Sequence, residues 1–583
     1  MRLLKIKKIR ILNVRSFKLL FLGLVTVITL TLFLNSRQAF GLNSLGKSIN
    51  PLHSIRASCS TPSSSKYASC LAEVVTNLNG SPMILPKSVV GNLGPTQFHT
   101  AYNLPCTPNG IIQSICSQPT TFGPETIAIV DAGSFDNSGG TIDESLNGYD
   151  ANYGLPACTE SNGCLSIVNE SGQTSPLPAA VSGWNTEIAL DVETAHMVCQ
   201  TCKILLVEAS TSSVADLAQS VQTAASFNPT SISNSYGSST EETSYDSSYN
   251  YNGIAVVASA GDSGSTSVSW PADIPYVVAA AGTTLSINSN NTWNSESVWS
   301  GSGGGCSTNS APVWQTDLSN WATAGCGNYR AYGDISADAD PNSGTAVYMA
   351  TSATSGSWIE VGGTSLSSPL IASSFALAGG VLSGNQAVSV LYGSFNSSNS
   401  HDITTGNDCT TTGELHCAAG VGFDTPSGLG SPNGISGFIV QPATNVSLKV
   451  ANQDGTAVDI TWTASQNSLV GGYYIYRDGV KIATVTGANN YIDSGLKPNT
   501  NYTYQVQTFD PFSNLATPTA AQSITTYLPA DINEDGHVNL IDLSILASKY
   551  GETGPNIGRA DINGDGQVNL IDLSILASKY GSE

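Results

Sequence analysis

The stretch that decides the fold is Trp184-Asn-Thr-Glu-Ile-Ala-Leu-Asp-Val-Glu-Thr-Ala-His196. Its good helix formers and its apolar residues, among them Ile188 and Leu190, predict a helix. Glu187 and Asp191 are four positions apart, and this spacing puts both carboxylates on one helix face. Two neighbouring acids repel each other when both are ionised, so one of them is driven to hold a proton. The pair is therefore either a solvated acidic face or a functional acid pair.

A second stretch, far downstream, favours the functional interpretation. In Val361-Gly-Gly-Thr-Ser-Leu-Ser-Ser-Pro369, Ser365 follows glycines and opens an apolar helix. A helix N-terminus offers unpaired N–H groups that can stabilise a developing oxyanion. Ser365 is therefore a candidate nucleophile.

Length and charge limit the classes of function. The chain has 583 residues, which is long enough for several domains. Its formal net charge is −22, and eight of its 21 basic residues fall in the first 40 positions, where there are no acids. The remainder is strongly acidic, which argues against nucleic acid as a partner. Few charges of either sign suit an acid-tolerant protein, although solubility alone also explains an acidic surface.

The N-terminus has the pattern of a targeting segment. Seven basic residues precede the apolar run Leu19–Leu34. A charged region followed by an apolar region of this length is typical of a signal peptide, and the nearest cleavage candidate is Ala39. A retained membrane anchor is the alternative. We expect a secreted or extracellular protein, attached to the membrane or cell surface if this segment stays.

Twelve cysteines in an exported chain predict disulfide bonds. They fall into six close sequence pairs, which are 59/70, 106/116, 158/164, 199/202, 306/326 and 409/417. We expect six local bridges. The pair 199/202 has the alternative of a redox-active or zinc-binding site, but there is no second C-x-x-C motif to complete a zinc site.

Between about residue 92 and residue 440, short apolar strands alternate with helical segments. Ile127–Val130 and Ile204–Val207 are strands that end in an acid, Asp131 and Glu208 respectively. Gly253–Ala258 is another strand. This alternation predicts an α/β domain with a parallel sheet and with catalytic loops at the strand ends.

A nucleophilic serine needs a base. The segment around Ser365 resembles that of subtilisin-type proteases, but none of the six histidines forms the His-Gly pair that opens a helix in a subtilisin. His196 lies nine residues past Glu187 and, at ~100° per residue, points to the opposite side of the helix. We therefore interpret His196 as a structural histidine.

Residues 92 to 440 resemble the sedolisins, which are serine-carboxyl peptidases on a subtilisin-like fold. The resemblance runs through several motifs in the same order. They are Leu93-Gly-Pro-Thr-Gln-Phe-His-Thr-Ala-Tyr102, the pair Glu187 and Asp191, Ser231-Ile-Ser-Asn-Ser-Tyr-Gly237, Ser259-Ala-Gly-Asp-Ser-Gly264, Trp270-Pro-Ala272, Asp334-Ile-Ser-Ala-Asp-Ala-Asp-Pro341 and Gly363-Thr-Ser-Leu-Ser-Ser-Pro369.

The resemblance implies a role for each site residue. Ser365 is the nucleophile that forms an acyl-enzyme, Glu187 is the general base, and Asp191 orients and tunes Glu187. Asp262 stabilises the oxyanion, for which it must be protonated. Because the ordinary pKa of a carboxyl group is about 4, a mechanism that needs a protonated carboxyl favours activity at acid pH. We expect an acid-acting serine endopeptidase with protein or peptide substrates.

The chain departs from the family in two places. Sedolisins usually carry a large inhibitory prodomain, whereas only residues 42–91 stand between the targeting segment and the catalytic start. Some members extend the acid relay with a Glu and a Trp, and the corresponding places here are Asp131 and Tyr236. Zymogen control and an outer relay are therefore open questions.

The family also binds one calcium ion late in the catalytic domain. Two segments match that pattern and supply two carboxylates and three backbone carbonyls, which are hard oxygen donors suited to Ca²⁺. The alternative is an ordinary glycine-rich loop. The candidate ligands are Asp402, Ile403, Gly420, Gly422 and Asp424.

Residues 441 to 527 change to alternating, exposed-face strands such as Tyr473–Tyr476 and Tyr502–Val506. The segment Leu496-Lys-Pro-Asn-Thr-Asn-Tyr502 resembles the tyrosine corner of fibronectin type III domains. We expect a β-sandwich that acts as a spacer or a weak binding module.

The C-terminus is a duplicated motif. Residues 531–551 and 561–581 match at 19 of 21 positions. Each copy opens with Asp-x-Asn-x-Asp-Gly and places an Asp at loop position 12, as in an EF-hand-like calcium loop followed by a helix. The candidate ligands are Asp531, Asn533, Asp535, the backbone carbonyl of His537 and Asp542 in the first loop, and Asp561, Asn563, Asp565, the backbone carbonyl of Gln567 and Asp572 in the second.

Paired loops of this kind resemble a dockerin, a module that docks on a cohesin partner. Leu540, Ile541, Leu570 and Ile571 occupy positions at which dockerins often contact cohesins. A calcium-stabilised cap without a partner is the alternative.

The expected organisation is that of a multidomain protein. Two classes of function compete: an active endopeptidase, and a non-catalytic cell-surface binding or scaffold protein on a degenerate protease fold. The intact set of Glu187, Asp191, Asp262 and Ser365 favours the enzyme. The expected segments are a signal peptide or anchor (1–41), a short propeptide remnant (42–91), a sedolisin-like domain (92–440), a fibronectin type III domain (441–527) and a dockerin-like domain (528–583).

Overall fold

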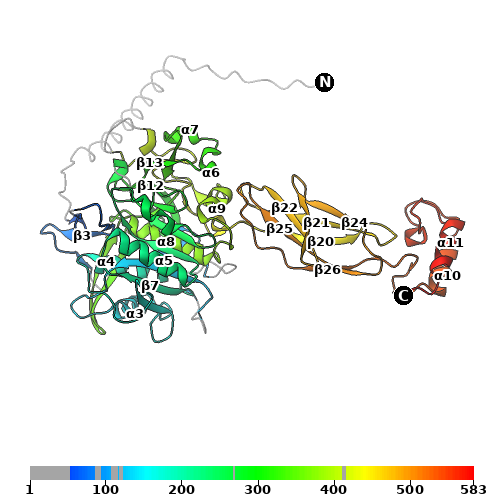
Figure 1. Ribbon diagram of the computed structural model, residues 1–583, viewed down its shortest axis with the longest axis horizontal. Helices are drawn as coiled ribbons and strands as arrows, with labels where there is room; N and C mark the ends of the chain where they lie inside the picture. Colours follow the sequence, from blue (N-terminus) through cyan, green and yellow to red (C-terminus); the bar gives the residue numbers. More distant parts are fainter. Residues whose placement is uncertain are drawn as a thin grey trace, which may run out of the picture. The chain divides into compact units, whose positions relative to one another are not determined.

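The computed structural model describes residues 53–62, 64–85, 93–106, 116, 122–266, 269–409 and 415–583. The predicted targeting segment, residues 1–41, lies outside them. Within this described part of the chain, no helix combines the length and the apolar character needed to cross a membrane. Three folded regions follow one another along the chain (Figure 1), and each is described by itself.

An eight-stranded, mostly parallel sheet forms the core of the first region. Every residue of its strands β8 and β10 is buried, as expected for parallel strands covered on both faces. This confirms the predicted fold class. In sheet order the strands are β12 (Trp293–Val298), β11 (Val278–Ile287), β10 (Ala255–Ser259), β8 (Ser231–Asn234), β5 (Thr126–Ala132), β7 (Lys203–Ala209) and β6 (Leu165–Asn169), with β15 (Ile335–Asp338) also paired to β11. Only β12 among them pairs in the antiparallel sense.

Two buried helices carry the predicted acid pair and the predicted serine. They are α4 (Trp184–Val198) and α8 (Thr364–Leu377), which pack against each other and against the sheet. All residues of α8 are buried. The other helices of this region are α2 (Pro95–Ala101), α3 (Ile142–Tyr153), α5 (Val214–Ser226), α6 (Val313–Thr316), α7 (Trp321–Ala324) and α9 (Ala387–Ser394).

The N-terminal extension is built into this region through two sets of strand pairs. β2 (Ser69–Cys70) pairs with β9 (Tyr236–Gly237), and β3 (Glu73–Asn77) pairs with β17 (Ser355–Gly362). β17 also pairs with β4 (Ile84–Leu85) and forms a hairpin with β16 (Thr345–Ser352). The remaining strands are β1 (His53–Ala57), β13 (Gly305–Ser310), β14 (Tyr329–Tyr332), β18 (Ser400–His401) and β19 (Ser431–Pro432).

The six predicted disulfide bonds are all present. Each joins the two cysteines that lie close in sequence, and no free cysteine is found among the described residues. Cys199 and Cys202 are bonded to each other, so neither sulfur is a thiolate ligand for zinc in this state.

The second region is the predicted β-sandwich. One sheet contains β20 (Thr444–Val450), β21 (Ala457–Thr463) and β24 (Asn490–Ser494). The other contains β23 (Val480–Val485), β22 (Gly472–Arg477), β25 (Asn501–Phe509) and β26 (Gln522–Thr525). The tyrosine corner is confirmed, because the backbone N–H of Lys497 donates to the hydroxyl of Tyr502 at 2.9 Å.

The third region contains two copies of one loop–helix unit. Its helices are α10 (Leu540–Lys549) and α11 (Leu570–Lys579), each capped by an Asn side chain. Val538, Leu546, Val568 and Leu576 are buried in a small core that both copies share. The four predicted docking residues are exposed, with relative exposures of 66% for Leu540, 52% for Ile541, 64% for Leu570 and 55% for Ile571.

Candidate active site

Ser365 is the second residue of α8, directly after the Gly363 cap and Thr364. Gly363 has φ +95°, and a Cβ added there would lie 2.0 Å from the carbonyl oxygen of Leu71, so only glycine fits. Pro369 has no N–H to donate to the carbonyl of Ser365 one turn earlier, and the Ser235 hydroxyl contacts that oxygen at 3.4 Å. The start of α8 is thus shaped to hold Ser365 beside the β8–β9 connection.

Glu187 and Asp191 lie on one buried face of α4, as the spacing predicted, and both have zero exposure. Burial raises the pKa of Glu187 well above its ordinary value, and the nearby Asp131 carboxyl raises it further. The neighbouring Ser365 hydroxyl lowers the pKa of Glu187 and offsets part of this rise. The pKa of Asp191 is raised by burial first and then by Asp131 and Glu187. The structure therefore brings the predicted base and the predicted nucleophile together.

The two oxygens of Asp262 differ in their surroundings. The backbone N–H and the hydroxyl of Thr364 both donate to Asp262 Oδ1, at 2.8 and 2.7 Å. Asp262 Oδ2 is buried and has no hydrogen-bond partner among the described residues. Burial raises the pKa of Asp262 well above its ordinary value, and the charge of Glu73 adds to the rise. A proton on Oδ2 is therefore free to be donated to a bound group.

Asp131 extends the group of buried carboxyls behind the acid pair. It lies at the end of β5 and is in register with Glu208 on β7. Burial raises the pKa of Asp131 to about 8, with a further contribution from Glu208. Burial also raises the pKa of Glu208 to about 7. Tyr236 is engaged elsewhere, since its hydroxyl donates to the side-chain oxygen of Asn234 at 2.9 Å.

Three groups at the site were given no role by the sequence analysis. The carbonyl oxygen of Ser235 accepts from the Ser365 hydroxyl at 3.4 Å, and Thr364 anchors Asp262. Glu73 belongs to the N-terminal extension, where burial and the charge of Asp340 raise its pKa to about 7. Ser235 and Thr364 stand inside motifs that were singled out, but Glu73 has no local pattern that marks it.

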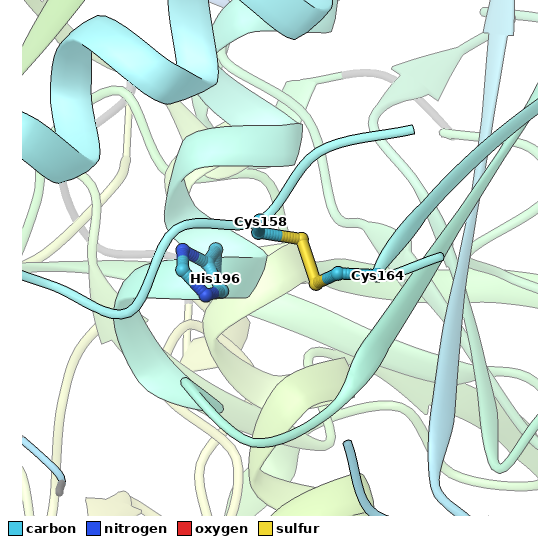
Figure 2. Close-up of side chains that lie close together, drawn as sticks. All are labelled: Cys158, Cys164 and His196. Atoms are coloured by element: carbon cyan, nitrogen blue, oxygen red, sulfur yellow. A yellow bond between two sulfur atoms is a disulfide. The ribbon is translucent and has the colours of Figure 1, made fainter. Parts of the chain in front are cut away.

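His196 is confirmed as a structural residue. Its Nδ1 lies 2.7 Å from the Oδ1 of Asp150, in a buried hydrogen bond. Figure 2 shows His196 beside the disulfide bond between Cys158 and Cys164. The three side chains have metal-ligand spacing, but both cysteines are oxidised and the histidine is paired, so the cluster is not a metal site.

The five predicted calcium ligands of the first region lie near one another. Gly422 N–H donates to both carboxylate oxygens of Asp402, at 3.2 and 3.0 Å, and Gly420 N–H donates to Asp424 at 2.8 Å. Burial raises the pKa of Asp424 to about 7, and the charge of Asp402 is among the causes. Ile403 is buried beside them. Two carboxyl groups and the backbone carbonyls of the same two segments are hard oxygen donors of the kind that a calcium ion takes.

The two C-terminal loops have the same internal hydrogen bonds. Asp531 accepts from Gly536 N–H, and Asp561 accepts from Gly566 N–H, both at 2.8 Å. At loop position 12, Asp542 and Asp572 are fully buried and each accepts backbone N–H groups from its own loop. The remaining predicted ligands, Asn533, Asp535, His537, Asn563, Asp565 and Gln567, lie in the same two loops. Both loops therefore present oxygen donors that fit calcium.

Comparison with known proteins gives a family model for each of the two C-terminal regions. Residues 441–517 match the fibronectin type III domain, and residues 529–579 match the dockerin type I domain. The matched residues fall within the second and third folded regions.

Relatives of the first region are named sedolisin-type proteins. Kumamolisin from Bacillus sp. (strain MN-32) is 30% identical over 347 residues, which cover 53% of this chain and 59% of kumamolisin. Sedolisin from Pseudomonas sp. (strain 101) is 34% identical over 185 residues, which cover 29% of this chain and 30% of sedolisin. A solved structure of Pseudomonas sedolisin, described as a serine-carboxyl proteinase complexed with two molecules of pseudo-iodotyrostatin, is 25% identical and has a TM-score of 0.47. The match covers 59% of this chain and 95% of the chain in the sedolisin structure.

The chain thus spans less than two thirds of the length of these two curated relatives. The chain has homologues in the sedolisin family, and it carries a fibronectin type III domain and a dockerin type I domain.

Proposed function

We propose that the protein is a serine-carboxyl endopeptidase that acts in acid on proteins or peptides. The observation that carries the proposal is the packing of α8, which begins with Thr364 and Ser365, against α4, whose buried Glu187 lies close enough to the Ser365 hydroxyl for that hydroxyl to lower its pKa. A serine is a weak nucleophile by itself and needs an adjacent base, which Glu187 supplies. The homology to kumamolisin and sedolisin supports the same conclusion.

The reaction follows from the roles of four residues. The Ser365 hydroxyl oxygen attacks the substrate carbonyl carbon while its proton passes to Glu187, which later gives it to the leaving nitrogen. Asp191 positions Glu187 on α4. Asp262, protonated, donates a hydrogen bond to the oxyanion from Oδ2. Water then hydrolyses the ester by the same route and frees Ser365.

Acid action follows from the charge that the site must carry. Asp262 donates only while it is protonated, and an ionised Asp262 would repel the oxyanion. Burial raises its pKa, so the protonated form persists from acid pH upward and is lost as the pH rises through that pKa. Burial raises the pKa values of Glu187 and Asp191 as well.

Calcium completes the proposal as a structural ion. Asp402 and Asp424, with the backbone carbonyls of Ile403, Gly420 and Gly422, would hold one ion in the catalytic domain. Each C-terminal loop would hold another. Bound calcium would neutralise the repulsion between neighbouring carboxylates and so stabilise the loops that they belong to.

The domain boundaries that we propose are those expected from the sequence, with a catalytic domain at 92–440 and accessory modules at 441–527 and 528–583. The dockerin type I match supports attachment to a cohesin-type partner through the exposed Leu540, Ile541, Leu570 and Ile571. Secretion is the location that a peptidase with such a module would require.

The test is cleavage of casein across the pH range by purified protein and three variants. Ser365→Ala and Glu187→Gln should each lose at least about 1000-fold in kcat/KM, because the nucleophile or its base is gone. Ser373→Ala removes a buried hydroxyl from the same helix and serves as the matched control, with activity retained. Activity that survives in either of the first two variants, with circular dichroism unchanged, would refute the assignment.

A further inference from the structure

One loop of the β-sandwich contacts the first folded region. We use the name docking loop for residues 510–516, Asp-Pro-Phe-Ser-Asn-Leu-Ala, which follow β25 directly. The first two regions belong to one compact unit, which contains residues 81–583. The contacts of the docking loop fit neither a flexible spacer nor a free binding module.

Two asparagines, one in each region, bind the backbone of the other region. The Asn385 side chain donates to the carbonyl oxygen of Leu515 and accepts from the Leu515 N–H, both at 2.8 Å. Asn514 Oδ1 accepts from the Gln386 N–H at 3.2 Å, and Asn514 Nδ2 donates to the Ser389 hydroxyl at 2.9 Å. Both asparagines are 3% exposed. Each buried amide therefore finds a donor and an acceptor across the contact, as a buried polar group requires.

Apolar side chains of the docking loop add to the core of the first region. Ala516 is 1% exposed and is part of the hydrophobic core cluster of that region. Phe512 packs against the same cluster, and its ring lies edge-on to that of Trp314 on α6, with 6.5 Å between the ring centroids. The contact therefore removes apolar surface of both regions from water, which favours the docked state.

A glycine of α9 fits the docking loop closely. The Gly393 carbonyl accepts from the Ser468 hydroxyl at 2.8 Å and from the Leu469 N–H at 3.1 Å. A Cβ added to Gly393 would lie 2.6 Å from Asp510 Oδ2. Asp510 is fully buried, and its carboxylate is held by the backbone N–H and the side chain of Asn514. Glycine weakens a helix relative to alanine, so the close approach of Asp510 gives the reason for a glycine at this place.

The docked segment is part of the framework that carries the candidate active site. The Tyr392 hydroxyl of α9 donates to Asp334 Oδ1 at 2.8 Å. The carbonyl of Asn385 accepts from the Gly253 N–H at 2.8 Å, two residues before β10 begins. β10 is the strand that leads to the loop of Asp262. A loop that holds α9 and Asn385 in place therefore acts on the framework of the first region.

We propose that residues 510–516 form an intramolecular docking surface for residues 385–393, through which the fibronectin type III domain braces the first region. Domains of one chain move relative to each other unless specific contacts hold them. Here the partner is a segment of the same chain, and the amide pairs, the buried Ala516 and the Gly393 contact all act at one place. The inference holds whatever reaction the site performs, because it concerns how two domains stabilise each other.

Hydrogen exchange followed by mass spectrometry tests the docking on the full chain, because a change in one region is measured in the other. The background is Ser365→Ala, which keeps the chain intact whatever its activity. Asn514→Ala, in the second region, should speed the exchange of the α9 amides at least about fivefold, because it removes the partner of the Gln386 N–H and that of the Ser389 hydroxyl. Exchange in α3 should stay unchanged.

Gly393→Ala makes the same test in the opposite direction. The added methyl group meets Asp510, so exchange in residues 510–516 should rise, although alanine by itself strengthens α9. Asn490→Ala removes an exposed amide elsewhere in the sandwich and is the matched control for Asn514→Ala. It should leave the exchange of α9 unchanged.

Two results would overturn the inference. One is an α9 exchange rate in Asn514→Ala equal to that in Asn490→Ala, because the docking loop would then protect nothing in the first region. The other is a rise of equal size in α3, because the variant would then have lost stability in general and not a local contact. Neither result bears on the peptidase assignment, which the casein assay decides separately.

Discussion

At the scale of single residues, the site depends on carboxyl groups that burial keeps protonated. Asp262 is the clearest case, since Thr364 uses Oδ1 alone and leaves Oδ2 as the oxygen that can donate. A carboxylic acid in this position donates a hydrogen bond as an amide does, but it loses the donated proton when the pH rises. The need for glycine at position 363 is equally local, because no side chain fits between the Gly363 Cα and the Leu71 carbonyl.

This difference between an acid and an amide makes a prediction for Asp262. Asp262→Ala should lower kcat by about 100- to 1000-fold, the usual cost of a lost oxyanion donor. Asp262→Asn keeps a donor at every pH, so it should retain more activity and lose the alkaline decline that ionisation of Asp262 causes. The measurement is kcat against pH with casein as the substrate. An Asn variant with the wild-type pH profile would show that Asp262 does not donate to the oxyanion.

At the scale of elements, two packed helices and two strand edges make the site. α4 supplies the acid pair and α8 the serine, and β9 and β17 supply the edges with which β2 and β3 of the N-terminal extension pair. The C-terminal module differs in how it is stabilised, because its helices α10 and α11 are short and share only a small core. Short helices with so little buried area need a further source of stability, which calcium can provide.

Calcium removal tests this directly. Chelation should leave the carboxylates of each loop without the ion that offsets their mutual repulsion, and should lower the melting temperature of the C-terminal module. Asp531→Ala together with Asp561→Ala should reproduce the effect of EDTA in calorimetry of the full chain. Glu552→Ala removes an exposed acid outside both loops and should melt like the wild type. If EDTA leaves every transition unchanged, neither the loops nor the Asp402/Asp424 site holds a calcium ion that matters to stability.

At the scale of the whole molecule, the protein combines a net charge of −22 with many buried carboxyls. Burial raises the pKa of Asp131 and Asp408 to about 8, and that of Glu208 and Asp273 to about 7. Each of these groups is stable inside the protein when protonated and costs free energy when ionised.

The sign of the pH dependence follows. A carboxyl whose folded pKa is raised contributes stability that is complete below its ordinary pKa of about 4 and is lost as the pH rises through 7 to 8. In saturating calcium, the melting temperature should therefore fall from pH 5 to pH 8, by on the order of 5 °C or more.

Asp131→Asn should reduce that fall by stabilising the protein mainly at pH 8, whereas Asp454→Asn changes an exposed acid and serves as the control. Calorimetry of the variants at both pH values is the measurement. A melting temperature that rises from pH 5 to pH 8 would show that these carboxyls do not limit stability.

The sequence by itself determined what depends on short spacings. The positions of Glu187 and Asp191 on one helix face follow from 3.6 residues per turn, and the start of a helix at Ser365 follows from its glycines. The six disulfides join near neighbours, so proximity along the chain was enough to pair them. The two calcium-loop patterns are complete within 12 residues, and the strand alternation was enough to give the fold class.

Only the tertiary structure decided which distant groups meet. Asp131 meets the acid pair because α4 packs against β5, and Glu73 meets Asp262 because β3 pairs with β17. The N-terminal extension is the strongest case. Leu71 and Ala72 contact the site through backbone N–H and C=O groups, which every residue carries, so no residue type marks them in the sequence.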